Sequence, residues 1–211
     1  MTHPVSWPSL KRSLVAILRG IKPEETAETI NALIDAGFEA IEIPLNSPDP
    51  FRSIQIAVET APQGCLIGAG TVLNTGDVDR LANVGGTLMV SPNVEPDVIA
   101  HAASRGMVTM PGVFTPTEAL SAVKAGASGL KFFPASVLGP SGIAAIRAVL
   151  PPQIEIGAVG GVSHDSYSDY RTVGVRTFGL GSSLYKPGMS AAEIAKRARL
   201  AVEAYDDVYG V

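Results

Sequence analysis

Eight short apolar runs recur along this 211-residue chain, and a longer segment with helical periodicity follows each of them. Most of the runs are apolar almost throughout, which is typical of strands that are covered on both faces, as in a parallel sheet. Few folds accommodate so regular an alternation. The runs span residues 14–19, 38–45, 66–72, 87–93, 107–113, 129–136, 154–162 and 177–183.

Three of the intervening segments carry clear helix signals. Residues 23–37 begin with a proline and two acids and end at Gly37, residues 115–126 begin with Thr115 and a glutamate three positions later, and residues 190–205 form the longest helical pattern. The other segments have weaker patterns but are long enough for short helices. They span residues 48–60, 74–84, 95–104, 139–149 and 164–173.

Eight successive strand–helix units predict an α/β fold, a (β/α)8 barrel. An open doubly wound sheet is the competing fold, but it usually has fewer strands at this length and a visible switch point. We expect one domain over residues 1–211, because no linker or shift in composition divides the chain. Residues 1–12 are expected to be a tail, with Trp7 packed on the outside of the barrel.

The charge and the hydropathy of the chain limit its partners. A formal net charge of −4 with no basic run argues against a nucleic acid or an anionic membrane surface. No stretch approaches the 18 or so consecutive apolar residues of a transmembrane helix, and the N-terminus lacks a signal-peptide hydrophobic segment. We therefore expect a cytoplasmic protein without nucleic-acid or membrane partners.

Cysteine and histidine residues give little sign of a metal site. Cys65 is the single cysteine, so an intramolecular disulfide is excluded, and a reducing compartment is favoured. His3, His101 and His164 do not show the spacing of metal ligands. We expect no bound metal and no cofactor.

Two charged residues interrupt otherwise apolar strands. Glu42 lies between two isoleucines, and Lys131 lies between Leu130 and Phe132. Because side chains alternate along a strand, each charge points away from its apolar neighbours. A buried ion pair is one interpretation. The other is a catalytic lysine with an acid–base partner, because desolvation favours the neutral amine that attacks a carbonyl, although a nearby carboxylate opposes this shift.

Glycine-rich pairs follow the last two predicted strands. Gly160 and Gly161 come after the seventh strand, and Gly181 and Ser182 after the eighth. Glycine lets backbone N–H groups approach an anion closely, and barrels of this class often hold phosphate at these two places. The sequence therefore predicts a phosphorylated ligand.

Seven short motifs together resemble the bacterial 2-keto-3-deoxy-6-phosphogluconate/galactonate aldolases. The resemblance covers about residues 10–206, and its motifs occur in order at the predicted strand ends. It implies a (β/α)8 fold, a homotrimer and a class I mechanism through a Schiff base. The motifs are AILRG (16–20), EIPLNSP (42–48), IGAGTVL (67–73), VSPN (90–93), KFFPAS (131–136), VGGV (159–162) and GLGSSLY (179–185).

The resemblance also implies roles for individual residues. Lys131 would form the Schiff base and Glu42 would be the general acid–base. The substrate would be a phosphorylated keto sugar acid, cleaved to pyruvate and glyceraldehyde 3-phosphate without a metal. The other residues would bind the substrate: Arg19 and Thr71 near its carboxylate and reacting carbons, Pro92 and Phe133 in the pocket wall, and Gly160, Gly161, Gly181 and Ser182 around the phosphate.

Three positions depart from the gluconate type within this family. Asn46 stands where that type has an arginine, and Pro44 and Val159 each stand where it has a threonine. The motifs that contain these positions instead resemble the galactonate type, so we expect a preference for the galactonate-derived substrate without exclusivity. Losing the arginine removes a bidentate carboxylate clamp, so Arg19 and backbone groups would have to hold that end of the substrate.

Two other functions remain open from the sequence. A phosphate-binding epimerase or isomerase would use Glu42 to move a proton and Lys131 as an electrostatic clamp, but it lacks a second candidate acid–base residue. A non-catalytic sugar-phosphate sensor is the other alternative. The intact pair of Lys131 and Glu42 argues against the sensor.

Overall fold

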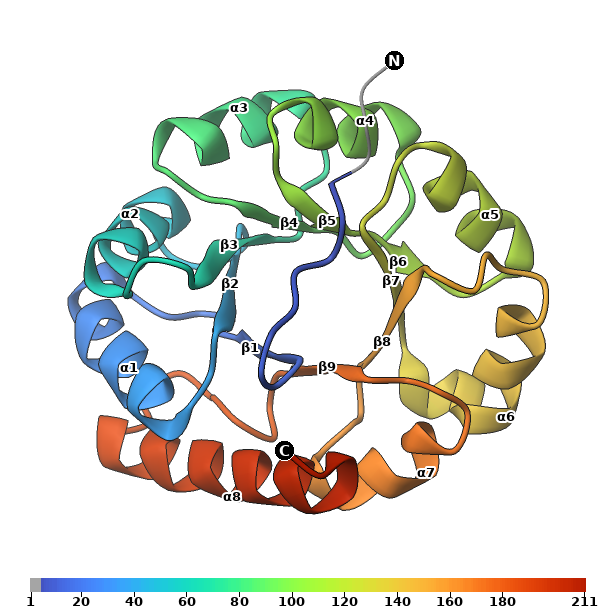
Figure 1. Ribbon diagram of the computed structural model, residues 1–211. Coiled ribbons are helices and arrows are strands. Elements are labelled where there is room, and N and C mark those ends of the chain that lie inside the picture. The colour runs from blue at the N-terminus through green and yellow to red at the C-terminus, as the bar shows by residue number, and fades with distance from the viewer. Residues whose placement is uncertain (1–4) are drawn as a thin grey trace.

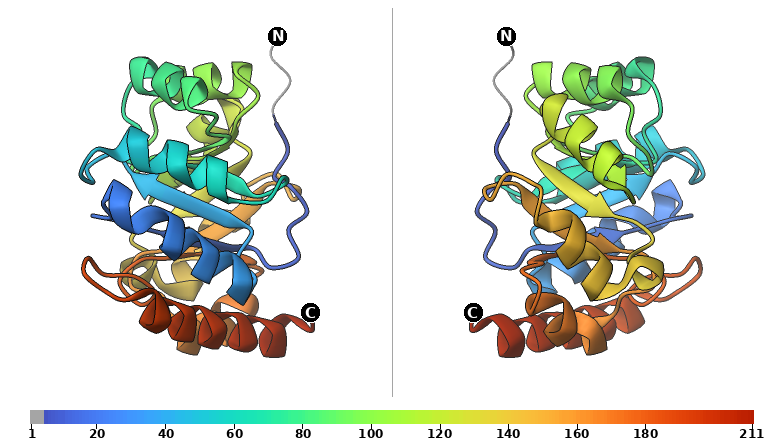
Figure 2. Two further views of the ribbon diagram at one scale, coloured as in Figure 1. Left: turned by 90° about the vertical axis from the view of Figure 1, so that its left-hand side faces the viewer. Right: turned by 90° about the vertical axis from the view of Figure 1, so that its right-hand side faces the viewer.

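The computed structural model describes residues 5–211, which form a barrel of parallel strands inside a ring of helices (Figures 1 and 2). The strands are β1 (Leu14–Ile17), β2 (Ala40–Pro44), β3 (Leu66–Gly70), β4 (Leu88–Val90), β5 (Val108–Met110), β6 (Gly112–Val113), β7 (Gly129–Phe132), β8 (Glu155–Val159) and β9 (Thr177–Leu180). The helices are α1 (Pro23–Ala36), α2 (Pro50–Thr60), α3 (Thr75–Asn83), α4 (Pro96–Ser104), α5 (Pro116–Lys124), α6 (Ala135–Arg147), the 3-10 turn η1 (His164–Ser166), α7 (Tyr167–Arg171) and α8 (Ala191–Tyr209).

The barrel closes through the fifth predicted strand, which Pro111 divides into β5 and β6. Proline has no N–H to donate to a neighbouring strand, but its carbonyl still accepts from the Lys131 N–H at 2.9 Å. The half before Pro111 pairs with β4 and the half after it pairs with β7. The predicted (β/α)8 barrel is confirmed, and the open sheet is wrong.

Several element boundaries differ from the prediction. The apolar run 129–136 is not all strand, because β7 ends at Phe132 and α6 begins at Ala135. The helix predicted from residue 139 therefore starts four residues earlier, and Gly139, with φ 69°, marks a kink within it. The last helix extends beyond residue 205 to Tyr209, whose hydroxyl donates to the Val175 carbonyl at 2.6 Å.

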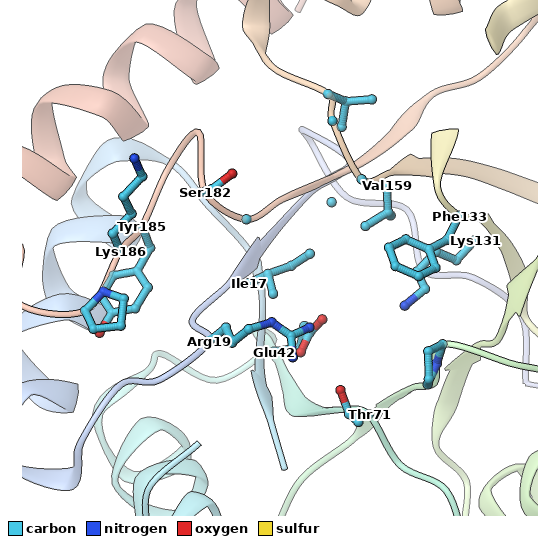
Figure 3. Close-up of a pocket in the computed structure, with 17 residues that line it drawn as sticks. Ile17, Arg19, Glu42, Thr71, Lys131, Phe133, Val159, Ser182, Tyr185 and Lys186 are labelled. Atoms are coloured by element: carbon cyan, nitrogen blue, oxygen red, sulfur yellow. The ribbon is translucent and has the colours of Figure 1, made fainter. Parts of the chain in front are cut away.

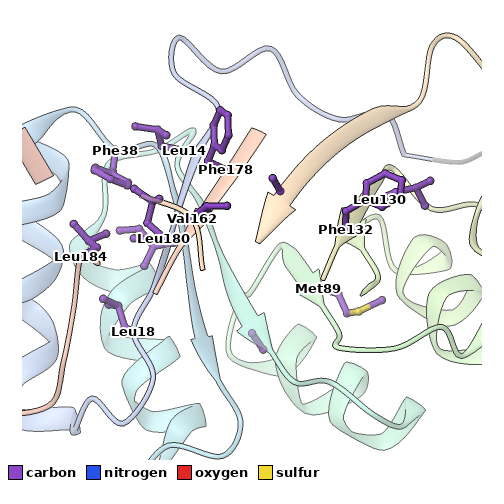
Figure 4. Close-up of a cluster of buried hydrophobic side chains, with 14 of the residues drawn as sticks. Leu14, Leu18, Phe38, Met89, Leu130, Phe132, Val162, Phe178, Leu180 and Leu184 are labelled. Atoms are coloured by element: carbon purple, nitrogen blue, oxygen red, sulfur yellow. The ribbon is translucent and has the colours of Figure 1, made fainter. Parts of the chain in front are cut away.

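Strand side chains alternate between two apolar layers. On β1, Leu14 and Ala16 belong to the layer between strands and helices, part of which Figure 4 shows, whereas Val15 belongs to a cluster inside the barrel. This alternation follows from the period of two along a strand. Each strand therefore offers every second residue to the interior, where a site can form.

The N-terminal segment closes one end of the barrel. Val5, Trp7 and Leu10 pack against the interior cluster, and Figure 1 shows the segment crossing the barrel opening. The Trp7 indole donates to Ser13 Oγ at 3.2 Å. Trp7 therefore packs against the cluster inside the barrel rather than on the outer surface as expected, because that apolar cluster would otherwise face solvent at this end. Residues 1–4, including His3, lie outside the described residues.

No helix in the described part of the chain is long and apolar enough to cross a membrane.

We predict that Trp7→Ala lowers the free energy of unfolding by about 1–3 kcal/mol, because it removes partly buried aromatic surface and one hydrogen bond. Trp7→Phe should lose less, because it keeps most of the packing. Urea unfolding followed by circular dichroism measures this, since Trp7 is the single tryptophan and fluorescence is lost with it. An unchanged free energy of unfolding in Trp7→Ala would contradict closure of this end by the segment.

Candidate active site

A cavity of about 340 Å³ opens where the strands end at their carboxyl termini (Figure 3). Active sites of (β/α)8 enzymes form at this face. All eleven residues predicted from the sequence line this one cavity. They are Arg19, Glu42, Thr71, Pro92, Lys131, Phe133, Val159, Gly160, Gly161, Gly181 and Ser182.

Glu42 and Lys131 both point into the barrel, and glycines lie beside them on the adjacent strands. The register places Glu42 beside Gly68, and Lys131 beside Gly112 and Gly157. Gly70, at the end of β3, leaves room for Glu42, since a Cβ there would clash with its carboxyl group. The two charged side chains are 3% and 7% exposed, so both lie almost out of water.

Burial shifts the proton affinities of both groups toward neutrality. It lowers the pKa of Lys131 to about 8, although the Glu42 carboxylate opposes part of the shift and Arg19 adds to it. Burial also raises the pKa of Glu42 to about 7, against the opposing charges of Lys131 and Arg19. Two groups with pKa values near neutrality can exchange protons with a substrate at little cost.

The pair does not form a contact ion pair. Among the ion pairs within 4 Å in residues 5–211, none joins Lys131 to Glu42. Glu42 Oε2 is buried without a hydrogen-bond partner in the described chain. A buried polar atom without a partner is costly, so the interpretation as a purely structural ion pair is not supported.

Arg19 is held at the cavity by the loop that follows β2. Its Nη1 donates to Asn46 Oδ1 at 2.8 Å, and the N–H of the next residue, Gly20, donates to Ser47 Oγ at 2.9 Å. These two bonds join the ends of β1 and β2. Asn46 therefore orients Arg19, which lies at the end of the neighbouring strand β1.

Thr71 adopts an uncommon backbone conformation directly after β3. Its φ of 58° lies in the left-handed region, which costs a non-glycine residue free energy, and residues strained in this way cluster at functional sites. Figure 3 shows its hydroxyl pointing toward the cavity. The strained conformation thus presents a hydroxyl beside the buried pair.

Glycines form the wall opposite, at the ends of β8 and β9. Gly160 and Gly161 have φ values of 89° and 73°, and a Cβ at Gly161 would lie 2.4 Å from Ser136 Oγ. A Cβ at Gly181 would meet no atom within 4 Å. Ser183 Oγ donates to the Val162 carbonyl at 3.2 Å and joins the two loops. This wall leaves space for an anion against the backbone.

Six further residues line the cavity and were not predicted. Ile17 and Gly179 could have been found from strand alternation, and Tyr185 lies within the quoted motif after the last strand. Lys186 follows it directly. The six are Ile17, Val162, Gly179, Tyr185, Lys186 and Pro187.

No group of three or more His, Cys, Asp or Glu side chains in the described residues could hold a metal ion. His101 instead bonds to Asp79 at 2.9 Å on the outer helices.

Comparison with known proteins agrees with this geometry. The family model for KDPG and KHG aldolase matches residues 9–200. A probable 2-dehydro-3-deoxy-6-phosphogalactonate aldolase of Rhizobium meliloti (strain 1021) is 70% identical over 98% of this chain and 97% of its own length. The 2-dehydro-3-deoxy-6-phosphogalactonate aldolase of Escherichia coli (strain K12) is 47% identical over 95% of this chain and 98% of its own.

A solved structure described as native KDPGal superposes with a TM-score of 0.94 at 45% identity, over 98% of this chain and 100% of that chain. The family expected from the sequence is confirmed: the chain belongs to the KDPG and KHG aldolases.

Proposed function

We propose that this protein is a class I aldolase that cleaves 2-dehydro-3-deoxy-6-phosphogalactonate to pyruvate and D-glyceraldehyde 3-phosphate. The observation that carries the proposal is the buried Lys131 amine, whose pKa is lowered to about 8, in one cavity with the unpaired Glu42 carboxylate. The proposed substrate is the one that appears in the names of the two relatives described above.

Lys131 begins the reaction as a nucleophile. Its neutral Nζ adds to the C2 ketone of the substrate, and loss of water gives an iminium ion. The iminium accepts the electron pair of the C3–C4 bond when that bond breaks, which leaves an enamine. The aldehyde that forms from C4 leaves as glyceraldehyde 3-phosphate. Protonation of the enamine at C3 and hydrolysis of the iminium then release pyruvate and restore the amine.

Glu42 moves the protons of this sequence. As a carboxylate it takes the proton from the C4 hydroxyl while the C3–C4 bond breaks, and as a carboxylic acid it can return a proton to C3. A pKa of about 7 suits both directions at neutral pH, since the ideal acid–base group titrates near the working pH.

The remaining residues bind the substrate along its length. Arg19, oriented by Asn46, is the proposed partner of the carboxylate, with the Thr71 hydroxyl beside it. Pro92 and Phe133 form apolar walls near Lys131, whose Nζ lies 5.1 Å from the centroid of the Phe133 ring. The phosphate is proposed to lie against the backbone of residues 160–161 and 181–182.

An epimerase that uses two carboxylates is not supported, because Glu42 is the single carboxylate among the described residues that line the cavity.

We also propose that three copies of the chain assemble in the cytoplasm. Assembly is supported by a similar chain, 46% identical with a TM-score of 0.93 over 95% of this chain and 74% of that chain, which comes from a cage designed by fusing symmetric oligomeric domains. The number three and the location come from the sequence resemblance and stay predictions.

Borohydride reduction in the presence of pyruvate should attach a three-carbon adduct to Lys131 and abolish activity. Peptide mass mapping locates the adduct. Because only the neutral amine attacks, adduct formation should accelerate as the pH rises through about 8. An adduct on Lys124 or Lys186, or none, would overturn the assignment.

Glu42→Gln should keep the pyruvate adduct while kcat for cleavage falls at least about 100-fold, the low end for a lost general base. The Glu42 carboxylate raises the pKa of Lys131, so its removal should also shift the pH dependence of adduct formation below about 8. Steady-state kinetics and trapping at several pH values measure both effects. Cleavage at a near wild-type rate would leave Glu42 as a counter-ion only.

The preference between C4 epimers should depend on Val159, which is buried in the cavity wall. Val159 packs closely on Gly179, where a Cβ would lie only 2.7 Å from Val159 Cγ2. We expect a higher kcat/KM for the galactonate-derived substrate, and Val159→Thr should shift the ratio toward the gluconate epimer. Threonine keeps the volume of the side chain and adds a hydroxyl that can form a hydrogen bond with the substrate. A site built around one such hydrogen bond can discriminate strongly between two substrates. A wild-type preference for the gluconate epimer, or an unchanged ratio in the variant, would contradict this prediction.

A further inference from the structure

Four charged side chains line the active-site cavity among the described residues, and the function proposed above employs three of them. Lys131 reacts, Glu42 moves protons and Arg19 meets the carboxylate. The fourth is Lys186, which has no role in that function. We propose that the Lys186 ammonium binds the phosphate of the substrate and makes the enzyme select phosphorylated over unphosphorylated aldehydes. This inference rests on the proposed aldolase function.

The backbone on both sides of Lys186 is fixed. The N–H groups of Leu184 and Tyr185 both donate to the Gly181 carbonyl at 2.9 Å, so the chain after β9 folds into a tight turn. Tyr185 is 4% exposed, and a Cβ at Gly20 would lie 2.8 Å from Pro187 Cγ, which shows how closely Pro187 packs on the loop after β1. The root of the Lys186 side chain is therefore held at the cavity wall.

Lys186 follows the same turn that forms half of the glycine wall. Gly181 and Ser182, at the start of the turn, line the cavity together with Lys186. In the view of Figure 3, Ser182 and Lys186 lie on one side of the cavity and Lys131 lies on the other. An extended substrate attached at Lys131 through C2 would direct its far end, which carries the phosphate, toward this side.

The glycine wall alone supplies no formal charge. Gly160, Gly161 and Gly181 offer only backbone groups, and Ser182 offers a hydroxyl. A phosphate monoester carries about −1.5 to −2 charges at neutral pH. Backbone amides can cradle it, but a neighbouring cation makes charge-assisted bonds that are stronger than neutral ones. Lys186 is the charged donor that this part of the cavity contains.

Within residues 5–211, no acidic side chain engages the Lys186 ammonium. In residues 5–211, no ion pair within 4 Å involves it, although four arginines and two histidines do form such pairs. The side chain is exposed at the cavity. A phosphate could thus bind it without breaking an existing salt bridge.

The test uses the reverse reaction, in which pyruvate condenses with an aldehyde. D-glyceraldehyde 3-phosphate and D-glyceraldehyde share the reacting carbonyl and differ in the phosphate. In Lys186→Gln, the ratio of kcat/KM for the first over the second should fall about 10-fold, and inorganic phosphate should inhibit about 10-fold more weakly, as expected for one lost charge-assisted hydrogen bond. Lys186→Arg should keep most of the ratio.

Lys124→Gln is the matched control, because it removes the same charge from an exposed lysine at the far end of α5 that does not line the cavity. Its ratio should equal that of the wild type. An unchanged ratio in Lys186→Gln, or an equal change in Lys124→Gln, overturns the role of Lys186. A wild-type protein that forms no pyruvate adduct at Lys131 and condenses neither aldehyde instead overturns the aldolase function, and this inference with it.

Discussion

The desolvation of one lysine and one glutamate inside the barrel is the constraint on which the rest of the site depends. A barrel interior excludes water, and charged side chains taken out of water shift their pKa values toward the neutral form. Here burial brings the pKa of Lys131 down to about 8 and the pKa of Glu42 up to about 7. Mutual attraction keeps the shifts moderate, so at neutral pH a usable fraction of each group is in the state that the chemistry needs.

Glycine contributes to this burial at Gly70, where a Cβ would clash with the Glu42 carboxyl. The other glycines beside the pair are constrained by different neighbours: a Cβ at Gly68 or Gly112 would clash with the backbone of Leu88 or Pro92, and a Cβ at Gly157 would clash with Met110 Cε. Glycine weakens a strand because it loses more conformational freedom on folding than other residues. The apolar layer between strands and helices offsets that cost, and the N-terminal segment with Trp7 covers the opposite end.

The cavity has a charge pattern opposite to that of the whole chain. The protein carries a formal net charge of −4, whereas three cations and one carboxylate line the cavity in the part of the chain that the structure describes. A concave site of one sign attracts substrates of the other sign and orients them. An acid with a carboxylate at one end and a phosphate at the other carries two anionic groups that match the charges of Arg19 and Lys186.

The sequence by itself determined the number of strand–helix units, the orientation of Glu42 and Lys131 opposite to their apolar neighbours, and the glycine-containing pairs after the last strands. These follow from local rules: side chains alternate along a strand, and glycine marks backbone that a ligand approaches. All eleven predicted site residues accordingly meet in one cavity. Tertiary structure alone decided that Glu42 and Lys131 stay apart, that Asn46 orients Arg19, that Trp7 covers the barrel end and that Lys186 reaches the cavity. Those features depend on the distances and the solvent exclusion that barrel closure and loop packing set, and residues far apart in the chain specify them jointly.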